Sequence, residues 1–304
     1  MTPRVAVTLG DPRGIGPEIA ARALSTPLDA EIVVIGAEDQ IAGVPATRRV
    51  STGLWSGGGS EDGQGRAVRA GRIAGHAVEQ AAKMALAGDV DAIVTGPAHK
   101  HALHLAGFPY PGHTEWLAEL AGVDVAMMLA ADRLRVVLVT THVPLRDVPD
   151  LVTTEKVVRT GRLTLDGLSD WWGIARPRLA VCALNPHAGE SGLFGDEDDR
   201  VLRPAAVELG AAGPLPADTV FVRAMRGEFD AVITPYHDVG MTAVKVAGFG
   251  RGVNVTLGLP FPRTAPDHGT AFDIAGTGTA DAASMLAAIQ LAIRLASRAG
   301  ARAG

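Results

Sequence analysis

Short apolar segments alternate with longer segments of helical periodicity along this chain, and this alternation limits the folds it can adopt. The short segments are β-branched or continuously apolar, as in buried strands of parallel sheets. We predict strands at Val5–Leu9, Glu31–Ile35, Asp91–Thr95, Leu134–Thr140, Leu179–Leu184 and Ala231–Thr234. We predict helices at Arg66–Ala87, Thr154–Leu168, Val201–Leu209 and Asp281–Ala299. The pattern indicates βαβ units and a largely parallel sheet.

The chain length sets the number of cores. At 304 residues, the chain exceeds the length that one hydrophobic core usually serves. We therefore predict the α/β class, with two α/β lobes, largely parallel sheets and an interlobe cleft.

Charge and cysteine content restrict the partners and the compartment. The formal net charge is −5 and no block of Lys and Arg occurs, which argues against nucleic acid or an anionic membrane as partner. Cys182 is the only cysteine, so an intrachain disulfide is excluded and a reducing compartment is expected. The sequence has no apolar run of 18 residues, so we expect a soluble cytoplasmic protein.

Three histidines follow predicted strands. His142 ends the run LRVVLVTTH, His187 follows LAVCALNPH and His237 follows AVITPYH. A lone histidine after a strand is more often a hydrogen-bonded loop residue. Parallel strands, however, end at the same edge of a sheet, where three imidazoles could converge. Three neutral imidazoles with open coordination positions are typical of a catalytic divalent-metal site.

Other polar residues indicate an anionic ligand. Lys245, Asn254 and Arg263 follow His237 closely, and an arginine can bind a phosphate or carboxylate through two hydrogen bonds. The alternative is a solvent-exposed group of charges. His113 and Thr114 are expected to open a helix, where a ligand would meet its positive end. Thr114 could equally be a simple N-cap.

The segment Gly10–Glu18 follows the first predicted strand and enters a helix. Glycines at such a position let the backbone approach a ligand. The segment lacks the Gly-Lys-Ser/Thr of a Walker loop, and its glycine spacing differs from the dinucleotide fingerprint. From the residues alone, a ligand-binding loop and a simple turn are equally good interpretations.

Nine short motifs occur in order along nearly the whole chain: GDPRGIGPEI, TGPAHK, PGHTEW, TTHVPLRD, LNPHAGE, GPLPADT, YHD, FGRGVNVTLGLPFPRT and DHGTAFDIAG. Together they resemble the 4-hydroxythreonine-4-phosphate dehydrogenase family of vitamin B6 synthesis. Only Ile41–Gly65 is short against the family pattern. The resemblance implies a fold similar to isocitrate and isopropylmalate dehydrogenases. It also implies a homodimer whose active site takes residues from both subunits.

The resemblance implies roles for individual residues. His142, His187 and His237 would bind one divalent metal, with zinc, magnesium and cobalt as the options. The substrate, a small phosphorylated molecule, would contact His113, Thr114, Lys245, Asn254 and Arg263. Residues 1–128 and 250–304 would form the first lobe, with the cofactor adenosine motif. Residues 129–249 would form the second lobe, with the metal ligands and the dimer interface.

The last motif implies the cofactor. His268, Gly269, Thr270 and Ala271 open a segment similar to the one with which related dehydrogenases hold the adenosine of NAD or NADP. Asp281 stands where those enzymes usually have an asparagine. A carboxylate there would repel a 2′-phosphate, so NAD is favoured and NADP is the alternative.

The family chemistry is oxidation of the secondary alcohol of 4-phosphohydroxy-L-threonine, followed by decarboxylation to 3-amino-2-oxopropyl phosphate. Lys245 is the candidate general base, and Asp218 and Asp238 are candidates to orient metal ligands. The alternatives within the family are a D-threonate or D-erythronate 4-phosphate dehydrogenase and a cis-dihydrodiol carboxylate dehydrogenase acting on the terephthalate diol. A phosphate acyltransferase is the alternative from another class.

Overall fold

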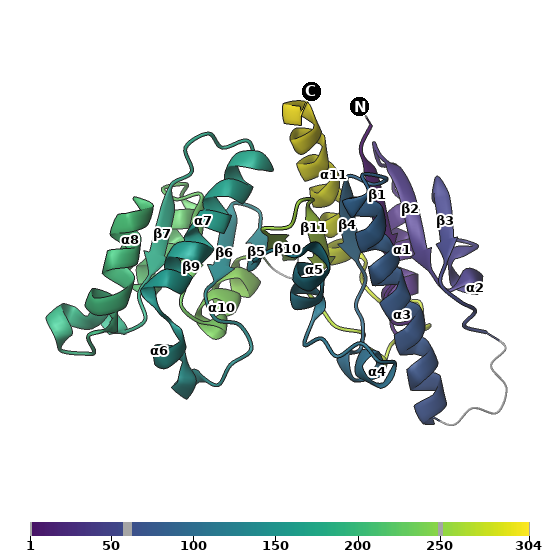
Figure 1. Cartoon of the computed structure of the whole chain (residues 1–304), viewed down its shortest axis with the longest axis horizontal. Helices are drawn as coiled ribbons and strands as arrows, with labels where there is room; N and C mark the ends of the chain where they lie inside the picture. Colours follow the sequence, from purple (N-terminus) through teal and green to yellow (C-terminus); the bar gives the residue numbers. More distant parts are fainter. Residues whose placement is uncertain (1, 57–62, 249–251, 304) are drawn as a thin grey trace. The chain divides into compact units, whose positions relative to one another are not determined.

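The computed structural model describes residues 2–56, 63–248 and 252–303 (Figure 1). The chain divides into two compact units, unit 1 (Met1–Asp124 and Leu259–Gly304) and unit 2 (Val125–Gly258). The sequence analysis grouped residues 125–128 and 252–258 with the first lobe. They belong to unit 2, because strand β10 (Val253–Leu257) pairs with β5 (Ala126–Ala131). Of the shortened segment Ile41–Gly65, residues 57–62 lie outside the described residues.

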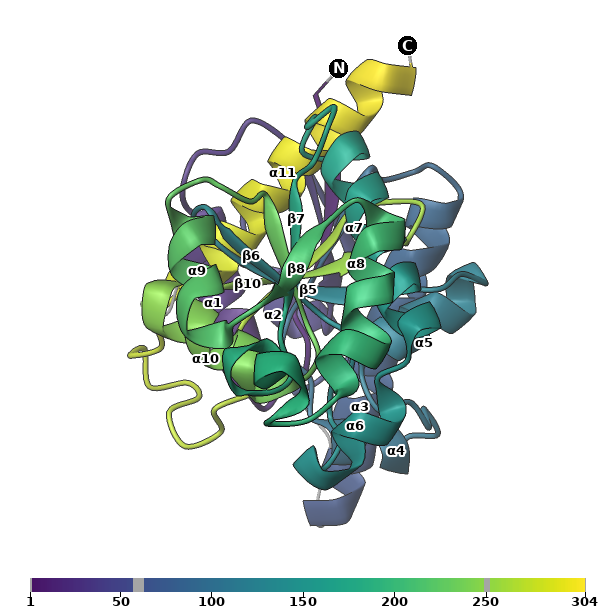
Figure 2. The same cartoon turned by 90° about the vertical axis from the view of Figure 1, so that its left-hand side faces the viewer.

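Unit 1 contains a parallel sheet in the order β3-β2-β1-β4-β11. Its strands are β3 (Arg48–Ser51), β2 (Glu31–Gly36), β1 (Arg4–Thr8), β4 (Ala92–Thr95) and β11 (Arg263–Pro266). Its helices are α1 (Gly16–Leu24), α2 (Glu38–Ile41), α3 (Gly63–Leu86), α4 (Lys100–Leu105), α5 (His113–Ala121) and α11 (Ala283–Ala303). Figure 2 shows α1 and α11 on one side of these strands and α3 and α5 on the other. The strands are therefore covered on both faces, which explains their continuous apolar sequences.

Unit 2 contains strands in the order β10-β5-β6-β9-β7-β8. Besides β10 and β5, these are β6 (Leu134–Leu138), β9 (Ala231–Thr234), β7 (Leu179–Cys182) and β8 (Ala212–Leu215). The helices are α6 (Val148–Leu151), α7 (Thr154–Asp170), α8 (Arg203–Leu209), α9 (Ala217–Met225) and α10 (His237–Gly248). β5 is antiparallel to both of its neighbours, and the strands from β6 to β8 are parallel. Leu129, Val136, Cys182 and Val232 form part of the core between this sheet and helices α9 and α10.

The α/β class and the largely parallel strands are confirmed. Each of the six predicted strands forms, as β1, β2, β4, β6, β7 and β9. The four predicted helices form as α3, α7, α8 and α11, and α5 begins at His113 as expected. In the described part of the chain, none of the helices combines the length and apolar character needed to cross a bilayer.

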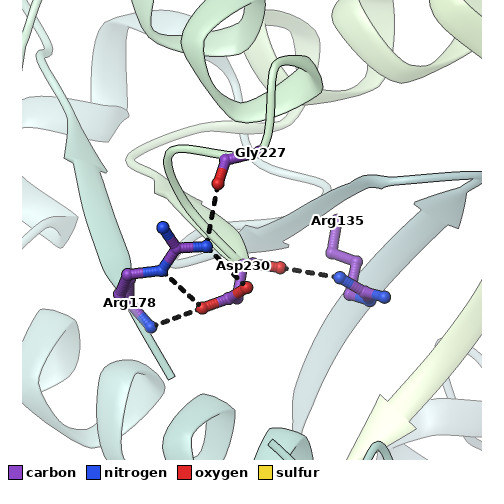
Figure 3. A network of polar contacts seen from close by, with 4 residues as sticks. All are labelled: Arg135, Arg178, Gly227 and Asp230. Carbon is purple, nitrogen blue, oxygen red and sulfur yellow. Dashed lines mark hydrogen bonds and ion pairs between the residues drawn. The ribbon is translucent and has the colours of Figure 1, made fainter. Parts of the chain in front are cut away.

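Each unit joins the amino ends of two neighbouring parallel strands with an arginine and an aspartate. In unit 2, the backbone N–H of Arg178 donates to Asp230 Oδ2 at 2.8 Å, and its guanidinium donates to both carboxylate oxygens (Figure 3). Arg135 of β6 donates to the carbonyl oxygen of Asp230 at 3.0 Å. In unit 1, Arg4 and Asp91 form the same arrangement between β1 and β4. These pairs stabilise the edge of each sheet where the strands begin.

We expect Asp230→Asn to lower the free energy of unfolding by about 1–2 kcal/mol at neutral pH. Burial alone raises the pKa of Asp230, but the hydrogen bonds from Arg178 outweigh it, so the pKa is lowered on folding. This stabilisation is therefore full above the unfolded pKa of about 3.9 and is lost as the pH falls through the folded pKa. Urea unfolding at several pH values measures it. Asp196→Asn, which affects an exposed ion pair, is the matched control; equal losses in both variants would contradict the prediction.

Candidate functional site

The three candidate metal ligands of unit 2 follow adjacent parallel strands. His142 follows β6, His237 is the first residue of α10 after β9, and His187 lies after β7 in a short turn, η2 (Pro186–Gly192). Because β6, β9 and β7 are neighbours, their carboxyl ends lie at one edge of the sheet. The rings of His142 and His237 have centroids 5.6 Å apart. Two imidazoles on one tetrahedral ion, at metal–nitrogen distances of about 2.1 Å, have centroids about 5 Å apart, so this pair fits.

His187 is held apart from that pair in a strained turn. Its φ and ψ are 52° and 28°, the left-handed region that residues with a Cβ rarely adopt. Its ring lies near Phe194, with centroids 6.2 Å apart. Among residues 2–56, 63–248 and 252–303, no group of three or more His, Cys, Asp and Glu side chains is arranged to hold a metal ion. One chain therefore brings together two of the three predicted ligands.

The candidate proton-transfer and orienting residues occupy different positions around this edge. Asp238 is bonded to Nδ1 of His237 at 2.7 Å through Oδ1, which leaves Nε2 of that ring for a metal. Asp218 is exposed in the first turn of α9. Lys245 is exposed on α10, eight residues after His237. The two positions are about 12 Å apart along the helix axis.

In unit 1, His113 and Thr114 open α5 as predicted, and both are near its positive end. Gly112 occupies the N-cap position, so the alternative that Thr114 is an N-cap is wrong. The His113 ring stacks on the buried Trp116 at 6.5 Å. Burial lowers the pKa of His113 to about 3, and the positive charges of Arg263 and Lys100 add to this effect. His113 is therefore a neutral imidazole at neutral pH.

Arg263 supplies a buried positive charge beside this histidine. Its side chain is 3% exposed at the start of β11, and its guanidinium donates to the hydroxyl of Thr95, at the end of β4. The alternative of a solvent-exposed charge is therefore wrong for Arg263. Burial lowers its pKa to about 10, opposed by Glu115, so it remains charged at neutral pH. Thr95 begins the TGPAHK motif, but no role was predicted for it from the sequence.

His113 predicts a specific loss of stability in acid. Its pKa is about 3 in the folded chain and about 6.5 when unfolded. Below pH 6.5 the unfolded state takes up a proton that the folded state does not, so stability falls until the pH reaches about 3. At pH 5 this loss is about 2 kcal/mol relative to pH 7.5. His113→Asn should remove it in urea unfolding at the two pH values. Parallel pH dependence in variant and wild type would contradict the buried neutral state.

Three residues predicted to bind substrate or cofactor carry a buried polar atom for which the described residues supply no hydrogen-bond partner. These atoms are Nε2 of His113, Oδ1 of Asn254 on β10, and Nε2 of His268. Buried polar atoms are nearly always paired in folded proteins, so each exception needs an explanation. A ligand that forms hydrogen bonds to these atoms would explain them, in unit 1 for His113 and His268 and in unit 2 for Asn254.

The predicted cofactor segment is held by helix α1. The backbone N–H of Ile15 donates to the carbonyl of Thr270 at 2.9 Å. Glu18 accepts hydrogen bonds from the N–H groups of Gly276 and Ala280. Arg22 donates to the Ala280 carbonyl at 2.7 Å. No role was predicted from the sequence for Glu18 or Arg22.

The segment Gly10–Glu18 is more than a turn, since it packs against the cofactor segment. A Cβ on Gly14 would lie 2.7 Å from the Thr270 carbonyl oxygen, so only glycine permits this approach. Arg13 lies over the ring of Phe272 at 5.0 Å, and its guanidinium is paired with the buried Asp11. Asp281, by contrast, accepts a hydrogen bond from the backbone N–H of Ala283, where α11 begins. Its observed role is therefore to cap a helix.

Residues 19–292 match the family described as pyridoxal phosphate biosynthetic protein PdxA. This chain belongs to the PdxA family. The 4-hydroxythreonine-4-phosphate dehydrogenase of Geobacter metallireducens is 44% identical, over 95% of this chain and 94% of that protein. The D-threonate 4-phosphate dehydrogenase of Salmonella typhimurium is also 44% identical, over 96% of this chain and 98% of that protein. The named relatives of this PdxA-family chain are dehydrogenases.

Solved structures agree with this assignment. The 4-hydroxythreonine-4-phosphate dehydrogenase of Klebsiella pneumoniae is 39% identical, with a TM-score of 0.86 over 97% of this chain and 99% of that one. A β-decarboxylating dehydrogenase from Thermococcus kodakarensis is 18% identical, with a TM-score of 0.52 over 95% of this chain and 83% of that one. The second likeness concerns the fold alone. It bears out the predicted similarity to the isocitrate and isopropylmalate dehydrogenase fold.

Proposed function

We propose that this PdxA-family enzyme oxidises the secondary alcohol of 4-phosphohydroxy-L-threonine with NAD and a divalent metal. Decarboxylation then gives 3-amino-2-oxopropyl phosphate, in pyridoxal phosphate biosynthesis. The observation that carries the proposal is the buried cation of Arg263 beside the neutral His113. A buried positive charge with a neighbouring helix N-terminus favours a phosphate or carboxylate ligand. The family relationship supports a phosphorylated substrate.

The residues of unit 1 are proposed to bind the anionic substrate and the cofactor. Arg263 and the first turn of α5 bind an anionic group of the substrate. Nε2 of His113, which has no hydrogen-bond partner within the described part of the chain, donates or accepts one hydrogen bond to the substrate, according to its tautomer. The segment from His268 to Ala271, held by α1, binds the adenosine part of NAD. The family resemblance puts Asp281 near the adenosine, where a carboxylate would repel a 2′-phosphate, so NAD is proposed over NADP.

The residues of unit 2 are proposed to hold the metal and to transfer a proton. His142 and His237 have the donor type and the spacing that zinc or cobalt requires, and His187 is the proposed third ligand. A divalent ion bound there supplies positive charge that acidifies the substrate hydroxyl, and bound NAD supplies the hydride acceptor. Asp238 fixes the tautomer of His237. Lys245 and Asn254 are proposed to contact substrate, with Lys245 as the proton acceptor, in a homodimer whose subunits share the site.

D-threonate 4-phosphate is the second candidate substrate, because the two named relatives have equal identity to this chain. It is also a phosphorylated hydroxy acid, so the same buried arginine suits it. The two substrates differ at the carbon next to the carboxylate, which carries an amino group in the first and a hydroxyl in the second.

The decisive experiment measures NADH formation by the purified enzyme with zinc, magnesium or cobalt. The substrates are 4-phosphohydroxy-L-threonine, D-threonate 4-phosphate, D-erythronate 4-phosphate and a cis-dihydrodiol carboxylate. Highest kcat/KM for the first supports the proposal. Preference for a threonate or erythronate phosphate would instead assign the enzyme to sugar-acid catabolism. Turnover of the dihydrodiol alone would overturn the role proposed for Arg263.

A further inference from the structure

We infer that Asp198 is a positioning residue that fixes the imidazole of His187 by holding the backbone on which it is carried. The inference rests on the proposed function, in which His187 is a metal ligand. Asp198 begins a short π-helical turn, η3 (Asp198–Leu202), and its side chain is fully buried. Its carboxylate accepts hydrogen bonds from the N–H groups of Leu184 and Asn185, at 2.9 and 3.0 Å. It also accepts one from Nδ2 of Asn185 at 3.0 Å.

His187 opens a run of left-handed backbone, the left-handed turn (His187–Ser191). Its five residues have φ between 43° and 81°, and four of them are not glycine. Residues with a Cβ persist in such conformations only where the surrounding structure holds them there, and such sites cluster at functional positions. The direction of the His187 ring therefore depends on whatever fixes this turn.

Asp198 binds the backbone before the turn and lies close to the middle of the turn. A Cβ on Gly189 would lie 3.8 Å from Asp198 Oδ2 and 2.8 Å from the Gly195 carbonyl oxygen. The N–H of Phe194 donates to the Gly189 carbonyl at 3.1 Å. The carboxylate thus links Asn185, two residues before His187, to η3, and the Asp198 side chain lies close to Gly189, two residues after it. A polar side chain without this function would not need to be buried there.

No sequence pattern indicated this role for Asp198. The run Gly195–Asp199 reads as GDEDD, and a cluster of acidic residues is usually a solvated surface. In the structure, Asp198 is buried, Glu197 accepts a hydrogen bond from Asn185 Nδ2 at 2.7 Å, and Asp199 forms an exposed pair with Arg203. Asp198 therefore differs from the other acidic residues of the run in being fully buried.

The test is the affinity of the purified enzyme for Co²⁺, measured by equilibrium dialysis together with the cobalt absorption spectrum. Asp198→Asn preserves size but places its amide NH₂ against the backbone N–H of either Leu184 or Asn185, which donate to different carboxylate oxygens. We expect the Kd for Co²⁺ to rise about tenfold or more, as for other residues that orient metal ligands, with an altered spectrum. Asp196→Asn, an exposed neighbour, should bind Co²⁺ within about twofold of wild type.

Two comparisons separate positioning from mere support of the fold. Asp230→Asn destabilises unit 2 far from this edge, so it should leave Co²⁺ affinity unchanged; a rise equal to that of Asp198→Asn would overturn the inference. If Asp198→Asn does not fold, Asn185→Ala replaces it, since this change removes the Nδ2 hydrogen bonds to Asp198 and Glu197. A folded Asn185→Ala variant with wild-type Kd would also overturn the inference.

Failure of the inference differs from failure of the proposed function. If His187→Ala loses Co²⁺ while Asp198→Asn binds it as wild type does, Asp198 has no positioning role and the ligand assignment stands. If His187→Ala binds Co²⁺ as tightly as wild type, the ligand assignment is wrong and the inference falls with it.

Discussion

Arg263→Met is expected to lower kcat/KM for the phosphorylated substrate by about 10²- to 10³-fold, while the KM for NAD stays within about twofold. The methionine fills the buried volume but removes the charged hydrogen bonds to the substrate anion, an effect of about 3–4 kcal/mol. Folding should tolerate the change. Burial lowers the pKa of Arg263 to about 10, so the folded chain disfavours this charge and gains by its removal.

The measurement is steady-state kinetics with each substrate varied separately, alongside urea unfolding. Arg49→Met is the matched control in unit 1, because Arg49 is a structural arginine that donates to the carbonyls of Ile41 and Val44. It should lower stability and leave kcat/KM nearly unchanged. Equal rises in the KM for substrate and for NAD in Arg263→Met would instead assign Arg263 a structural role.

His237→Ala is expected to reduce turnover about 10³-fold or more, and His142→Ala should have a similar effect. A divalent ion stabilises developing negative charge by several kcal/mol, and the loss of one of two adjacent imidazoles weakens its binding. Residues that act as a unit lose function non-additively, so the double variant should be scarcely worse than either single one. Metal content after dialysis and kcat provide the two measurements.

His104→Ala is the control for these variants, since His104 is an exposed histidine of α4 in unit 1. It should retain metal and turnover. Full metal content in both His142→Ala and His237→Ala would show that the 5.6 Å ring pair is only a packing contact. Additive losses in the double variant would show that the two histidines act separately.

The sequence predicted the parts of the fold that depend on local apolar pattern. The six buried strands with continuous apolar runs were all found. β3, β8 and β11 were missed, because each has four residues and contains charged, glycine or proline residues that weaken a strand pattern. β5 is AMMLAA, without β-branched residues. Its antiparallel pairing with β10 joins residues more than 120 positions apart, which no local pattern reports.

The candidate site was predictable to a similar extent. The sequence shows a histidine after each of three predicted strands. Their location at one edge of the sheet could be predicted, because parallel strands share their carboxyl edge. The family resemblance added roles for Arg263 and His113, whose burial the sequence could not show. Asp198 and the left-handed turn at His187 were missed, since both depend on contacts between η2 and η3. The capping bond of Asp281 was missed because the resemblance suggested a cofactor contact.

Unit 1 is built from two separate stretches of chain, whereas unit 2 is one continuous stretch between them. β4 lies between β1 and β11, and α11 packs on β1, β4 and β11. During synthesis, β1 to β4 therefore leave the ribosome well before their last strand and covering helix exist. Unit 2 can complete its core first. The apolar face that later receives α11 is exposed while unit 2 is being synthesised. Slower translation of residues 125–258 should therefore lengthen the time for which chaperones can bind this face.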